Sequence, residues 1–98
     1  MTLAARFSER IHDAMRQAQG LGYRPTRIQQ MLAESPAVEV AKRLVTATEI
    51  HDGLVEMKKM GRLDLTFEHI MLEPEFAPLF KQIDLEYAKM RLNQLKGI

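Results

Sequence analysis

Two histidine–aspartate doublets, His12-Asp13 and His51-Asp52, and a third imidazole at His69 are the residues best suited to metal chemistry. A His–Asp pair joined by a further His and Asp can hold the metal ions that hydrolyse phosphate esters. Here no further histidine or aspartate lies three or four residues from either doublet. Adjacent residues on a helix also point about 100° apart, so the two members of a doublet do not readily share one ion. We predict no metal site and no cofactor, and interpret the doublets as solvated or capping residues.

Two pairs of carboxylates, Glu73 with Glu75 and Asp64 with Glu68, are the candidates for general acid–base catalysis. Such catalysis requires burial or a neighbouring charge that raises one pKa. These residues flank predicted helix starts, where the helix dipole stabilises negative charge, so a capping role is expected. No nucleophile–base pair or phosphate-binding loop is visible, and we expect neither catalytic residues nor enzymatic activity.

Basic residues are concentrated near the start of the chain. Residues 1–30 hold five arginines against two acidic residues, a net charge of +3, whereas residues 31–98 hold nine basic and eleven acidic residues, a net charge of −2. A phosphate-binding surface would use Arg6, Arg10, Arg16, Arg24, Arg27, Lys42 and Arg43. Glu9 and Asp13 interrupt this face, and nucleic-acid-binding domains are usually more basic. Binding of nucleic acid or a nucleotide, in a regulatory or defence-related protein, is therefore the alternative hypothesis.

Length and composition are typical of one small globular domain. Ninety-eight residues are enough to bury a core, and the sequence contains no cysteine for a disulfide or a thiolate metal site. The early charge at Arg6 disfavours a signal peptide, and no apolar run is long enough to span a membrane. We expect a single domain over residues 1–98 in the cytoplasm, with no membrane partner.

Helical periodicity runs through the whole sequence. Apolar residues recur at spacings of three and four from Leu3 to Leu21, which predicts a long first helix capped by Thr2 and ended by Gly20 and Gly22. Shorter apolar stripes follow, and the prolines Pro25 and Pro36 open the next two helices. No alternating strand pattern occurs. The sequence therefore predicts an all-α fold, a compact orthogonal bundle of about six or seven short helices.

The stretch from Gly61 to Leu72 joins two of these predicted helices. A fourth helix, capped by Thr48 or Asp52, should stop at Gly61, and a fifth should begin at the cap Thr66. One or two turns are expected between Pro74 and Phe80. Asp84 is expected to cap the last helix, whose apolar stripe is Leu85, Ala88, Leu92 and Leu95.

Several short strings occur in an order that resembles a small all-helical bacterial domain of unknown function. They are Tyr23-x-Pro25-Thr26, Ala41-Lys42-Arg43-Leu44 and Gly61-Arg62-Leu63-Asp64-Leu65-Thr66-x-Glu68. The resemblance covers residues 22–98 and leaves the first helix, residues 1–21, as a variable addition. It implies a helical domain that occurs alone or at the end of longer proteins, and it carries no catalytic motif.

Methionine is abundant, with seven residues in 98, and this residue type fills core gaps and also populates adaptable binding surfaces. The first helix has a long apolar stripe for so small a domain, so part of it is expected to contact a partner. We predict a non-enzymatic protein–protein interaction module that forms a homo-oligomer and binds another protein. Its predicted contact residues are Phe7, Ile11, Met15, Met57, Met60 and Met90.

Overall fold

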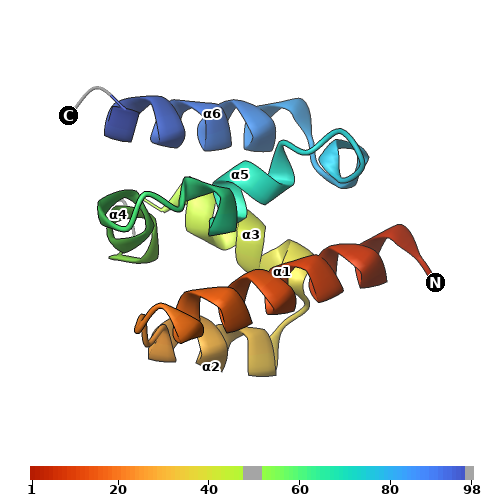
Figure 1. Cartoon of the computed structure of the whole chain (residues 1–98). Helices are drawn as coiled ribbons and strands as arrows, with labels where there is room; N and C mark the ends of the chain where they lie inside the picture. Colours follow the sequence, from red (N-terminus) through yellow and green to blue (C-terminus); the bar gives the residue numbers. More distant parts are fainter. Residues whose placement is uncertain (48–51, 97–98) are drawn as a thin grey trace.

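A computed structural model describes residues 1–47 and 52–96, and the described residues form helices joined by short turns (Figure 1). The elements are α1 (Leu3–Gly20), α2 (Thr26–Glu34), α3 (Ala37–Thr46), α4 (Asp52–Lys59), η1 (Leu63–Leu65), α5 (Phe67–Met71), η2 (Ala77–Leu79) and α6 (Gln82–Lys96), where η denotes a 3₁₀-helix. No strand occurs among these residues. The all-α prediction is confirmed.

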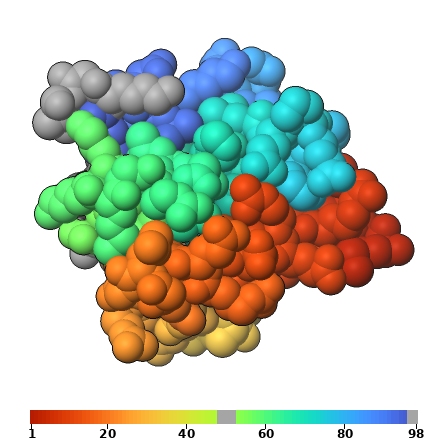
Figure 2. Space-filling model, viewed as in Figure 1, coloured from red at the N-terminus to blue at the C-terminus, as the bar shows by residue number. Residues whose placement is uncertain are grey.

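The helices are arranged with α1 and α2 on one side, α6 on the opposite side, and α3 and α5 between them (Figure 1). The central helices make the contacts that connect the two sides, since α3 packs against both α1 and α6, and α5 packs against α6 and α3. Helix α4 is seen almost end-on while α1 and α6 lie lengthwise. The predicted orthogonal arrangement is thus visible. Figure 2 shows the surface of residues 53–80 lying against that of α1.

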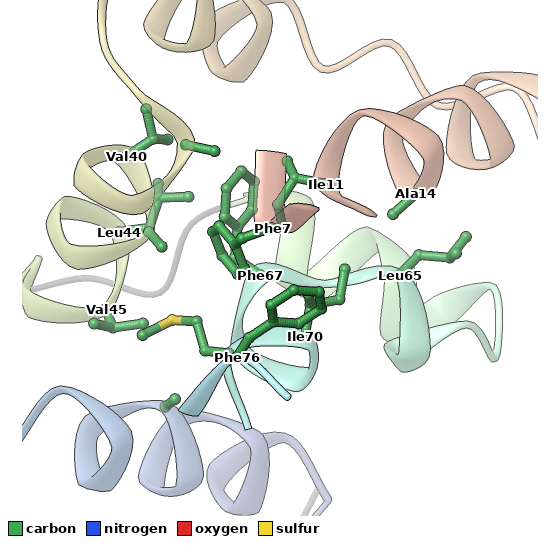
Figure 3. Close-up of a cluster of buried hydrophobic side chains, with 14 of the residues drawn as sticks. Phe7, Ile11, Ala14, Val40, Leu44, Val45, Leu65, Phe67, Ile70 and Phe76 are labelled. Atoms are coloured by element: carbon green, nitrogen blue, oxygen red, sulfur yellow. The ribbon is translucent and has the colours of Figure 1, made fainter. Parts of the chain in front are cut away.

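One core cluster draws side chains from α1, α3, η1 and α5, and these side chains point toward one another in Figure 3. Phe7 of α1 is 0% exposed. Its ring meets the rings of Phe76 and Phe80 edge-on, with centroids 5.4 and 5.3 Å away. Edge-to-face pairs of this kind contribute about 0.5–1.5 kcal/mol each beyond the area they bury. The ring of Phe7 therefore fastens the first helix to the segment that precedes α6.

Helices α1 and α4 end in the same way, in a Schellman motif around a glycine. Gly22 and Gly61 have φ of +97° and +70°, a left-handed conformation that glycine adopts without steric cost. The Tyr23 N–H donates to the Ala18 carbonyl at 3.1 Å, and the Arg62 N–H donates to the Met57 carbonyl at 2.8 Å. The predicted stop at Gly61 is confirmed.

The Thr66 side chain joins η1 to α5, and its predicted role as a cap is confirmed. Its hydroxyl accepts a hydrogen bond from the His69 N–H at 3.2 Å and donates one to the Leu63 carbonyl at 2.7 Å. Thr66 is buried, so both bonds are shielded from water. Thr2 caps α1 in the predicted way as well, accepting from the Ala5 N–H at 3.1 Å.

Two local predictions need correction. Gly20 is the last residue of α1 and does not have a positive φ. Of the two glycines Gly20 and Gly22, Gly22 is the one in the left-handed conformation. Asp84 does not precede α6 as its N-cap residue, because the helix starts at Gln82. The Asp84 carboxylate lies in the first turn and accepts a hydrogen bond from the Lys81 N–H at 3.1 Å. Glu68 lies near the start of α5 as predicted, and its side chain is fully buried. Thr48 lies outside the described residues.

The Thr66 cap gives a first prediction. Thr66→Ala should lower the free energy of unfolding by about 1–2 kcal/mol, because it removes the cap of α5 and the bond to Leu63. Thr66→Ser keeps both hydrogen bonds and should lose less than half as much. Urea denaturation measures both, with Thr2→Ala as the control at an exposed cap. Equal losses for the Ala and Ser variants would show that the hydroxyl contributes nothing.

Asp64 gives a pH prediction. Its carboxylate accepts hydrogen bonds from Arg62 at 3.0 and 3.1 Å, and this guanidinium holds the pKa of Asp64 below its ordinary value. A lowered folded-state pKa stabilises the protein above the unfolded value of about 3.9, and the contribution is lost as the pH falls through the folded value. Asp64→Asn should therefore be less stable than the wild type at pH 7, with a difference that shrinks as the pH falls below about 4 and vanishes only below the folded-state pKa. In an Arg62→Gln background the same substitution should have a smaller effect, because only the weaker contributions of the Asp64 backbone N–H and of His69 remain, and an undiminished difference there would exclude Arg62 as the main cause.

Candidate interaction surfaces

Three of the predicted contact residues, Phe7, Ile11 and Met57, are core residues of this chain. Their exposed fractions are 0%, 1% and 3%. The apolar stripe of α1 packs on α3, η1 and α5 and is therefore part of the core. The prediction that these three side chains anchor a partner is corrected: their surface is already removed from water by the chain itself.

The other three predicted contact residues differ in exposure. Met15 and Met60 are half-buried and pack against the core cluster. Met90 is 47% exposed and lies on the side of α6 that faces away from the core. Of the six residues, Met90 is therefore the one best placed to meet another molecule.

Met90 belongs to a continuous exposed surface that we call the outer α6 face. Its members are Ile83, Glu86, Lys89, Met90, Asn93 and Gln94, and all of them are exposed. Five of them, all but Ile83, line a shallow hollow. Ile83 is 51% exposed and was missed by the sequence analysis, although it lies seven residues, about two helical turns, before Met90 on the same side.

Buried polar groups fix the rotation of α6 about its own axis and so determine which residues face outward. The Arg91 guanidinium is buried and donates from Nε to the Val45 carbonyl at 2.8 Å and from Nη2 to the Ala47 carbonyl. The Asp84 carboxylate holds the first turn through the Lys81 N–H. Because a misplaced buried guanidinium would lose these bonds, the outer α6 face is a fixed surface.

A second surface is the groove between α1 and α2, which has a volume of about 360 Å³. Its apolar lining comes from Met15, Leu32 and Ala33, and its polar lining comes from His12, Arg16, Gln19 and Gln29. This groove brings together the predicted contact residue Met15 and the predicted phosphate-binding residue Arg16. Helix α2 contributes one buried side chain, Ile28, to the core, and Met31 and Leu32 pack against it partly buried.

Three arginines of the predicted phosphate-binding set have acidic partners within the chain. Arg10 pairs with Glu73 at 3.0 Å, Arg16 with Asp13 at 3.3 Å, and Arg6 with Glu75 at 3.6 Å. The set therefore does not form one free cationic face. No ion pair is recorded, within the described residues, for the remaining four, Arg24, Arg27, Lys42 and Arg43.

The candidates for chemistry are separated by the fold. His12 is exposed on α1, His69 is exposed on α5, and His51 lies outside the described residues. Across residues 1–47 and 52–96, no three His, Cys, Asp or Glu side chains are grouped to hold a metal ion. Glu73 and Glu75 are ion-paired with arginines, and the pKa of Asp64 is lowered, which is opposite to the shift that a general acid needs.

Comparison with protein-family models, with curated proteins and with solved structures finds no match to this chain. The resemblance of residues 22–98 to a small bacterial helical domain stays a prediction. In the described part of the chain, no helix has the length and apolar character needed to cross a membrane.

Proposed function

We propose that this protein is a non-enzymatic interaction module that associates with itself and with another protein through a helix face. The observation that carries the proposal is the exposure of Ile83 and Met90, 51% and 47%, on one side of α6. Single exposed apolar side chains are common and need no explanation. Here two of them lie two turns apart on a helix whose rotation is fixed by buried polar groups, which is the pattern of a helix that packs against a partner.

The ion pairs of the candidate acids support binding over catalysis. Arg10 holds Glu73, Arg6 holds Glu75, and Arg62 holds Asp64. For Asp64, the hydrogen bond from Arg62 lowers the pKa of the carboxyl group, which is opposite to the shift that a general acid needs. The proposed compartment is the cytoplasm, which is supported by a sequence free of cysteine.

Self-association is tested by the mass of the protein in solution. The wild-type mass should rise above 11.3 kDa with increasing concentration in light scattering or sedimentation equilibrium. Ile83→Glu/Met90→Glu should remain at the monomer mass, since it places two charges where apolar contact is expected. The matched control is Leu21→Glu, which alters an equally exposed apolar residue at the end of α1.

Circular dichroism should show that all these variants are folded, because the altered side chains are exposed. A wild type that stays monomeric at every concentration would contradict self-association. A double variant that associates like the wild type would contradict the role of α6.

Nucleic-acid binding is a second candidate, and the exposed cations Arg24, Arg27 and Arg43 with the half-buried Lys42 are the observation that favours it. If these four contact phosphates of a DNA duplex, the logarithm of the affinity should fall with the logarithm of the salt concentration with a slope of about −3.6. Arg24→Ala/Arg43→Ala should reduce this slope by about half. Filter binding or fluorescence anisotropy over a salt series measures it, and absence of binding at low salt excludes this function.

A further inference from the structure

We infer that two copies of this chain pair through the outer α6 face with their α6 helices antiparallel. A two-fold axis near residues 86–88 would place Ile83 of each copy against Met90 of the other, and Glu86 of each copy beside Lys89 of the other. This inference rests on the proposed self-association and adds the partner, the register and the direction.

The first support is the angular order of side chains around α6. With about 100° per residue, Ile83 lies about 20° to one side of Met90. Glu86 lies about 40° and Lys89 about 100° to the other side. The face therefore has an apolar centre, and its two charged residues share one flank.

The second support is the symmetry of an antiparallel pair. A two-fold axis perpendicular to the helices reverses position along the helix and keeps each flank facing the same flank of the partner. The midpoint between Ile83 and Met90 and the midpoint between Glu86 and Lys89 differ by one residue, about 1.5 Å along the helix. A single axis therefore brings both pairs into contact. A parallel pair would instead set Glu86 against the opposite flank, where the only cation among the described residues, Arg91, is buried and donates to the Val45 and Ala47 carbonyls. A parallel pair therefore provides no exposed cation opposite Glu86.

The third support comes from a comparison of Glu86 and Lys89 with other charge pairs among the described residues. Glu56 and Lys59 on α4 have the same i,i+3 spacing and form an ion pair at 3.4 Å. Asp13 and Arg16 on α1 do the same at 3.3 Å. In the described structure, no ion pair is recorded for Glu86 or Lys89. Charges at the rim of an interface contribute more to the choice of partner and orientation than to affinity, which suits a role in setting the register.

The size of the face indicates a weak dimer. Helix α6 has 15 residues and is therefore about 22 Å long, and one helix face is about 10 Å wide. A stable interface of standard size buries about 800 Å² on each partner, which is more than one such face supplies. The dimer is therefore expected to form at high concentration and to exchange quickly.

The test exchanges the charges. Glu86→Lys alone gives a homodimer with lysine facing lysine, and Lys89→Glu alone gives one with glutamate facing glutamate. Each should dimerise at least tenfold more weakly than the wild type in sedimentation velocity at low salt. An equimolar mixture of the two variants restores both opposite-charge contacts and should dimerise like the wild type. The double variant Glu86→Lys/Lys89→Glu should do so as well.

The matched control uses Glu56→Lys, Lys59→Glu and their mixture, which change an equivalent exposed pair on α4 and should leave dimerisation unaltered. If the Glu86 and Lys89 variants associate like the wild type while Ile83→Glu/Met90→Glu does not, α6 is the interface, the antiparallel register is wrong and the proposed function stands. If the mixture fails to restore association, the register is also overturned. A monomeric wild type overturns both the pairing and the proposed self-association.

Discussion

The burial of Phe7 between Phe76 and Phe80 is the contact on which the rest of the structure depends. It joins the first turns of α1 to the segment just before α6, residues that are about seventy positions apart in the sequence. The ion pairs of Arg10 with Glu73 and of Arg6 with Glu75 reinforce the same junction at the surface. Because α1 is held here, its apolar stripe covers α3, η1 and α5, and it is an integral part of the core and not a separate contact helix.

The place of α6 follows from this arrangement. Its inner side meets α5 and α3, while the bonds from Arg91 to the end of α3 prevent it from rotating. One consequence is that apolar residues on its other side, Ile83 and Met90, cannot turn inward. The proposed interaction surface thus follows from packing, because the core contacts one side of α6 and leaves the other side exposed.

Local features of the fold were predictable from the sequence because their causes are local. The glycine at 61 and the threonine cap at 66 act within a few residues, so spacing alone predicts them. The exposed apolar face of α6 could not be predicted in this way, since periodicity shows that a helix has an apolar side without showing what covers it. Phe7 and Ile11 were therefore assigned to a partner and Ile83 was overlooked. The pairing of Arg10 with Glu73 spans 63 residues and has no signature in the sequence.

The apolar side of α1 is buried in the core, and the proposed association surface lies on α6. The most direct measurement is an NMR spectrum of the methionine methyl groups recorded over a concentration series, since methionines lie in both places. The account predicts that the Met90 signal shifts with concentration while those of the buried Met57 and Met71 do not. A concentration-dependent shift at Met15 on α1 with a constant Met90 signal would contradict it.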